Sequence, residues 1–68
     1  MFTNEIKLKV EQYLKENEGA TSIQWNGDDT CTTFDKNNVA IDDYIIGFED
    51  GKIYYTPVSN WNVTLEIE

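Results

Sequence analysis

The chain contains no histidine and no arginine, and both absences narrow what it can do. Histidine is the side chain whose ordinary pKa lies near neutrality, and arginine is the residue that clamps phosphate or carboxylate groups with two hydrogen bonds. An enzyme built from this chain would depend on carboxylates with strongly shifted pKa values, such as one member of Asp28-Asp29 or Asp42-Asp43. Adjacent acids in turns are usually solvated, so we expect no catalytic residues and no enzyme activity.

Cysteine and long apolar runs are also scarce. Cys31 is the single cysteine, so an internal disulfide or a thiolate metal cluster is excluded, and we expect its side chain to be a small buried or half-buried apolar group. No stretch approaches the roughly 18 apolar residues of a membrane span, and the N-terminus lacks the pattern of a signal peptide. Zinc ligand sets and the EF-hand spacing are missing as well. We therefore predict a soluble cytoplasmic protein without metal, cofactor or membrane contact.

Acidic residues, in contrast, are abundant and unevenly placed. The 68 residues include 13 acids and five lysines, for a net charge of −8. Residues 1–15 hold three of the lysines and only two of the acids, and the rest of the chain holds eleven acids and two lysines. A surface formed by residues 16–68 would therefore be strongly acidic. It would repel nucleic acid and attract basic protein surfaces within about a Debye length, roughly 8 Å in physiological salt. We expect no direct binding to nucleic acid.

The length allows one small domain, residues 1–68, and the 40% apolar content with nine aromatic residues predicts that it folds. Its first part has helical spacing, from Thr3 or Asn4 to about Glu18. The residues expected on the inner face are Ile6, Val10, Tyr13 and Leu14, and Phe2 can reach Ile6. Gly19 is the expected end of the helix, because glycine favours the left-handed conformation found there.

After Gly19 the apolar period changes to two, which is typical of strands. The first expected hairpin turns at residues 26–29 and leaves two arrangements open. A four-residue loop places Trp25 opposite Thr30, so that Ile23, Trp25 and Phe34 share a face and Cys31 points away; a three-residue loop reverses this.

A second turn at residues 35–38 leads into a long strand, residues 39–49, which needs a bulge near Asp42-Asp43 to keep one apolar face. Asp50-Gly51 is the clearest hairpin signal. A two-residue turn there pairs Glu49 with Lys52, Phe48 with Ile53, and Ile46 with Tyr55. The same register places Tyr54 opposite Gly47 on the face away from the core, with Ile45 diagonal to it.

The last strand is expected from Trp61 to Glu68, with Trp61, Val63, Leu65 and Ile67 pointing inward. Together these patterns predict an α+β fold, in which an N-terminal helix packs on a small antiparallel sheet of about five strands.

A folded acidic surface can occupy a basic channel by standing in for phosphates, and this is the function that the charge favours. Duplex DNA carries one charge per about 1.7 Å of axis, whereas carboxylates two residues apart on a strand are about 6.6 Å apart, so several elements must contribute. The candidate partner-binding residues are Asp28, Asp29, Asp42, Asp43, Glu49, Asp50, Tyr54, Glu66 and Glu68. The simpler interpretation is that these acids occupy turns and outer faces and keep a small protein soluble.

In size and charge alone, the chain resembles the small acidic inhibitors that phages use against host nucleases, CRISPR and restriction effectors, repair enzymes and transcription proteins. The resemblance implies a DNA-mimic-like protein that blocks a basic, nucleic-acid-handling host protein, and no motif carries over a functional residue. The alternative is a small accessory or structural module, as a homodimer through the edge of its last strand, whose acidity serves solubility.

Overall fold

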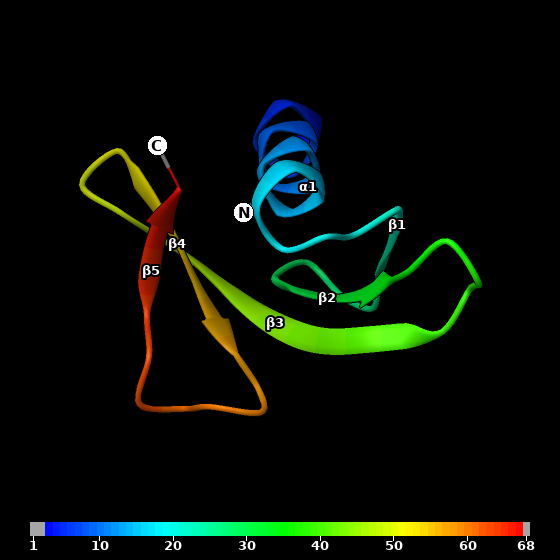
Figure 1. Cartoon of the computed structure of the whole chain (residues 1–68). Helices are drawn as coiled ribbons and strands as arrows, with labels where there is room; N and C mark the ends of the chain where they lie inside the picture. Colours follow the sequence, from blue (N-terminus) through cyan, green and yellow to red (C-terminus); the bar gives the residue numbers. More distant parts are fainter. Residues whose placement is uncertain (1–2, 68) are drawn as a thin grey trace.

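The computed structural model describes residues 3–67, which form one helix and a five-stranded antiparallel sheet (Figure 1). The elements are α1 (Asn4–Asn17), β1 (Ser22–Trp25), β2 (Thr30–Phe34), β3 (Ala40–Glu49), β4 (Lys52–Pro57) and β5 (Leu65–Ile67). The strand order is β1-β2-β3-β4-β5, so each strand pairs with its neighbour in the chain. The predicted α+β fold is confirmed. The expected contact of Phe2 and the side chain of Glu68 lie outside the described residues.

Helix α1 begins and ends where its sequence indicates. The Thr3 hydroxyl caps the first turn by accepting a hydrogen bond from the Ile6 amide at 3.2 Å. Gly19, at a φ of 73°, takes the left-handed conformation just past the last turn. Val10 and Leu14 are fully buried, and they place one face of α1 against the sheet.

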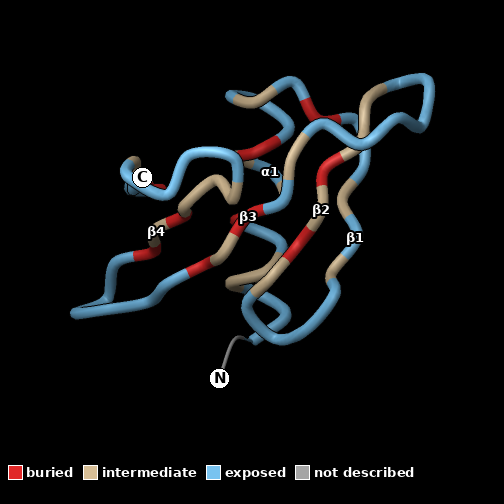
Figure 2. Tube along the Cα trace, turned by 90° about the horizontal axis from the view of Figure 1, so that it is seen from below, coloured by how far each residue is buried: buried red, intermediate tan, exposed pale blue. Residues whose placement is uncertain are grey.

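The sheet curls around the helix. In Figure 1, β1, β2 and the first part of β3 lie beneath α1, while β4 and β5 rise beside it. The ten-residue strand β3 runs through both parts and connects them. Buried positions are concentrated within α1 and the strands, and the turns are exposed (Figure 2). The core cluster consists of Val10, Leu14, Cys31, Tyr44, Ile46, Ile53, Tyr55 and Ile67.

The hairpin at Asp50-Gly51 has the predicted register. Both turn residues have positive φ values, 54° for Asp50 and 77° for Gly51, as the favoured two-residue hairpin turn requires. Glu49 pairs with Lys52, and the neighbouring pairs Phe48–Ile53 and Ile46–Tyr55 follow as expected.

The first hairpin differs from both arrangements considered above. Trp25 pairs with Cys31, so residues 26–30 connect the paired positions, and the Asn26 amide donates to the Thr30 carbonyl at 2.9 Å. Cys31 therefore shares a face with Trp25, as in the three-residue alternative, and its side chain is fully buried. Phe34 pairs with Ser22 and lies on the face opposite to Ile23 and Trp25, whereas the four-residue loop would have placed all three on one face.

The bulge in β3 lies next to the expected position. Thr33 pairs with Asp42 but Phe34 pairs with Ala40, which leaves Ile41 as the extra residue. The bulge brings Asp42, Tyr44 and Ile46 onto the face that α1 covers.

The expected last strand is too long. Strand β5 contains only Leu65–Ile67, and Trp61 is 64% exposed instead of pointing inward. Two successive turns replace the first half of the expected strand: the Asn60 amide donates to the Pro57 carbonyl at 3.1 Å and the Val63 amide to the Asn60 carbonyl at 3.2 Å. The hydrogen bonds of these turns use backbone groups that a strand would offer to β4. Residues 61–64 therefore do not pair with β4, although their apolar and polar residues alternate as in a strand.

Candidate protein-binding surface

Helix α1 covers one face of the sheet, and the other face carries a contiguous set of side chains from all five strands. We call it the open face. Strand alternation and the observed register define its members. They are Ser22, Gln24, Thr30, Thr32, Phe34, Ala40, Asp43, Ile45, Gly47, Glu49, Lys52, Tyr54, Thr56 and Glu66.

Four of the predicted partner-binding residues come together on the open face: Asp43, Glu49, Tyr54 and Glu66. Tyr54 is central, because it pairs with Gly47 of β3 on one side and with Glu66 of β5 on the other. Glu49 stands opposite Lys52, the only basic residue among the open-face members. The face therefore combines three carboxylates, one lysine and two partly buried aromatic rings, those of Tyr54 and Phe34.

Three more predicted residues lie in turns at one end of this face. Asp28 and Asp29 belong to the β1–β2 turn and Asp50 to the β3–β4 turn. In a sheet of sequential antiparallel strands alternate turns lie at the same end, so both turns border this end of the face, although β3 continues past the β1–β2 turn before it reaches Asp50. A hydrogen bond of 2.7 Å from the Ile46 amide to the Asp29 carbonyl fixes the β1–β2 turn against β3. The exposed carboxylates of both turns extend the acidic surface of the open face.

Asp42 does not join this surface. Successive strand residues point to opposite faces, so Asp42 lies on the helix side of β3 and Asp43 on the open face. The Asp42 carboxylate accepts hydrogen bonds from the Ser59 hydroxyl at 2.6 Å and from the Asp43 amide at 2.8 Å. Its role in the structure is to hold the β4–β5 connection against β3. Glu68 lies outside the described residues.

A chain of polar side chains fixes the position of Asp43. The Thr32 hydroxyl donates to its carboxylate at 2.5 Å, and the Asn26 amide group donates to the Thr32 hydroxyl at 2.8 Å. The chain crosses from the β1–β2 turn through β2 to β3. Asp43 is thus an oriented, exposed carboxylate, which loses less conformational freedom on binding than a free side chain does.

The helix supplies two carboxylates to the sheet, which the sequence pattern did not indicate. Glu11 accepts a hydrogen bond from the Trp25 indole nitrogen at 2.7 Å, and the Lys7 ammonium lies 5.2 Å from the centre of the same ring system. From sequence Glu11 looks like a solvated partner of Lys15 four residues later. The indole N–H of a half-buried tryptophan needs an acceptor, but nothing in the sequence says which acid provides it.

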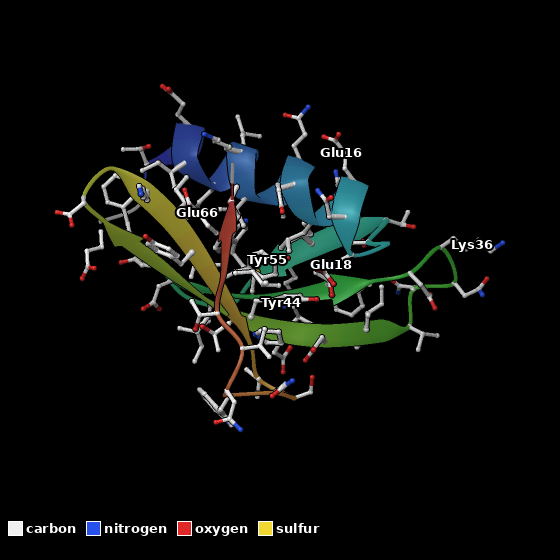
Figure 3. The ribbon with its side chains drawn as sticks, turned by 60° about the vertical axis from the view of Figure 1, so that its left-hand side comes forward. Glu16, Glu18, Lys36, Tyr44, Tyr55 and Glu66 are labelled. Carbon is white, nitrogen blue, oxygen red and sulfur yellow. The ribbon has the colours of Figure 1, made fainter. Side chains whose placement is uncertain are left out.

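Glu18 makes the second such contact, at the other end of α1. It accepts a hydrogen bond from the Tyr55 hydroxyl at 2.8 Å, and Figure 3 shows Glu18, Tyr44 and Tyr55 lying close together. The Tyr55 ring packs edge-on against Tyr44 and Tyr13, with centroid separations of 5.5 Å and 5.8 Å. Burial, and then the nearby charge of Glu18, raise the pKa of Tyr44 to about 12. These contacts fasten the helix to the sheet.

The described residues offer little for chemistry. Burial, and then the charge of Asp43, raise the pKa of the Cys31 thiol to about 12, so this thiol stays protonated and is a poor nucleophile. Within residues 3–67, no group of three or more carboxylate or cysteine side chains is arranged to hold a metal ion. A shallow hollow lies along one flank of α1, lined by Lys9, Gln12, Tyr13 and Glu16.

No protein-family model, curated protein or solved structure matches this chain. In the part of the chain that the structure describes, no helix has the length and apolar character needed to cross a membrane. The open face and its adjoining turns are therefore the surface on which a functional interpretation depends.

Proposed function

We propose that the protein is a non-enzymatic binding protein that attaches to a basic surface of a host protein and blocks it. The observation that carries the proposal is the composition of the open face and its adjoining turns. Asp43, Glu49 and Glu66 lie on the face, the Asp28-Asp29 pair and Asp50 border one end, and Lys52 is the only counter-charge among the open-face members. Complementary charge accelerates encounter with a basic partner and selects against acidic ones.

An apolar centre within this acidic surface supports binding to protein. Ile45 and Tyr54 occupy neighbouring strands of the open face, and both are partly exposed. Aromatic and aliphatic anchors surrounded by charged residues are common in protein interfaces, where the anchors contribute most of the affinity. A surface whose acidity served only solubility would not need these anchors.

The partner class that we propose is a nucleic-acid-binding enzyme in the host cytoplasm, with the protein acting as a DNA-mimic-like inhibitor of the kind that phages use against host defence. Carboxylates from β3, β5 and two turns, together with the absence of arginine, give a surface that competes for sites built to bind phosphates. The carboxylates of this surface are more widely spaced than the phosphates of DNA. The surface therefore imitates the sign and position of the DNA charge, but not the regular spacing of the phosphate backbone.

Affinity capture from a bacterial lysate tests the proposal. The immobilised protein is expected to retain a basic nucleic-acid enzyme that salt or added DNA releases, as mass spectrometry of the eluate would show. The double variant Glu49→Lys with Glu66→Lys should weaken capture at least about tenfold, because both changes turn attraction on the open face into repulsion.

The matched control is Glu5→Lys with Glu16→Lys, which changes the net charge equally on exposed positions of α1. It should leave capture within about threefold of the unmodified protein, since only the overall field changes. Equal losses in the two variants, or an eluate without a basic protein, would refute the proposal.

A second candidate function has its own observation. Strand β5 ends the strand order, so no other strand of residues 3–67 pairs with its outer edge. Leu65 of β5 is 41% exposed, and Trp61 of the preceding connection is 64% exposed. Free edges pair readily with another chain. A homodimer through β5 would make the protein an accessory module. Sedimentation at moderate salt distinguishes the two functions, since a stable dimer favours the module and a monomer favours the inhibitor.

A further inference from the structure

Gly47 lies in the second half of β3, at a place where the fold does not require glycine. The glycines with positive φ are Gly19 and Gly51, so the backbone at Gly47 suits any L-residue. A Cβ atom added to Gly47 would meet nothing within 4 Å. Glycine in a strand is unfavourable because it loses more backbone freedom and packs no side chain. The fold would therefore be at least as stable with a β-branched residue at this position.

The missing side chain leaves the backbone of Gly47 exposed on the open face, beside Tyr54 of β4, and we call this uncovered stretch the notch. Tyr54 is directly across from Gly47, and Glu66 follows on β5. Ile45 and Glu49 flank it along β3, each about 6.6 Å away in an extended strand. A cross-strand aromatic ring sometimes covers a glycine in a sheet, but here no Tyr54 atom comes within 4 Å of the Cβ position. The notch is open to solvent.

We propose that this notch receives a lysine or arginine side chain of the basic partner. The residues around it suit such a side chain. Ile45 offers an apolar surface to the stem, Tyr54 is an aromatic partner for the cation, and Glu49 on β3 and Glu66 on β5 supply carboxylates. Lys52 stands opposite Glu49 across the strands, whereas Glu66 stands opposite Tyr54, so we take Glu66 as the principal counter-ion. The inference rests on the proposed function and identifies the point at which the partner is held.

NMR titration with a short oligo-arginine peptide tests the notch without knowledge of the partner. The amide signals of Gly47 and Tyr54 should shift, while that of Gly19 should stay in place, and a glycine-serine peptide of the same length should shift none of them. Shifts spread evenly over all acidic segments would contradict the inference, because they indicate diffuse attraction only.

The decisive variant is Gly47→Val, which fills the notch without changing charge. It should weaken oligo-arginine binding about fivefold, comparable to the loss of an exposed cation–π contact and its packing. Ala40→Val is the matched control, since it adds bulk to the same face of the same strand at the opposite end. Urea denaturation should show that Gly47→Val is as stable as the unmodified protein or more stable, which separates lost binding from misfolding.

The outcomes distinguish failure of the notch from failure of the proposed function. Equal peptide affinity of the two valine variants overturns the notch, even when Glu49→Lys with Glu66→Lys still abolishes capture from lysate. Loss of peptide binding in Gly47→Val alone supports the notch, even when the lysate yields no basic enzyme. Shifts at Gly47 that grow with protein concentration in the absence of peptide would assign the notch to a second copy, and so overturn its assignment to a partner.

Discussion

At the scale of single residues, the buried hydroxyl and thiol groups make folding sensitive to alkaline pH. The pKa of Tyr44 is raised from 10.0 and that of Cys31 from 9.0, each to about 12, because burial opposes the charged form. The pKa of Tyr55 is raised for the same reason. The unfolded chain therefore loses these protons at lower pH than the folded protein does.

The sign of the pH effect follows directly. The stabilisation is fully present below the unfolded pKa values of 9.0 and 10.0, and is lost as the pH rises toward about 12. We expect the urea midpoint at about pH 11 to be clearly lower than at about pH 8. Tyr44→Phe, which removes one of the titrating groups and keeps the ring, should show a smaller decline. An unchanged midpoint up to pH 11 would contradict the assigned burial.

Cys31 allows a simple test of how its hairpin is registered. Its side chain is fully buried beside Tyr44, so a thiol reagent such as DTNB should label the native protein far more slowly than the urea-unfolded chain. Labelling of Cys31 should require opening of the sheet. The labelling rate should therefore fall further under conditions that stabilise the folded protein. Rapid labelling of the native protein would mean that Cys31 faces outward, as in the four-residue loop alternative.

At the scale of elements, the Asp50-Gly51 turn is the point where sequence dictates structure most directly. Gly51→Ala should lower the free energy of unfolding by about 1–2 kcal/mol, because alanine is strained at positive φ. Asp50→Asn is the control, since asparagine tolerates positive φ, and it should change the stability by less than about 0.5 kcal/mol. Chemical denaturation measures both. Equal effects would show that the turn is not held in the two-residue form.

The helix and the hairpin whose ends are set by neighbouring residues in the sequence could be predicted. The other elements depend on contacts between residues far apart in the chain. Thr3, Gly19 and the Asp-Gly turn each favour one backbone conformation, so α1 and the β3–β4 hairpin follow from sequence. The connection at residues 26–30 offers several turn residues in succession, and its length is decided by the burial of Cys31 against α1 and β3. Trp61 continued a regular alternation, but the hydrogen bonds of the 57–63 turns exclude it from β5.

In the candidate surface too, some residues could be placed from the local sequence and others only from distant contacts. Glu49, Tyr54 and Glu66 were predictable as outward-facing residues, because the hairpin register and the alternation of β5 place them there. The placement of Asp42 and Asp43 was not predictable, because a bulge was expected near them. Since the bulge lies at Ile41, the two acids alternate, with Asp43 on the open face and Asp42 on the helix side. The contacts of Glu11 and Glu18 join residues far apart in sequence, and no local pattern reveals them.

At the scale of the whole molecule, the net charge of −8 should give folding and binding opposite responses to salt. Raising sodium chloride from about 20 mM to about 500 mM screens the repulsion among the acids, so the Tm of the isolated protein should rise by a few degrees. The same change should weaken binding to a basic partner. Differential scanning fluorimetry and a binding titration in the same buffers check both. A Tm that falls with salt would contradict this account.

The strand order also has a kinetic consequence. Each strand pairs with the next one along the chain, so no pairing has to wait for distant segments to meet, and the entropy lost in closing each loop is small. Chains with such local pairing reach the native state quickly, starting from hairpins that form in about 1–10 μs. The Asp50-Gly51 turn between β3 and β4 is a natural starting point. A protein of this kind can reach its folded state soon after it is synthesised.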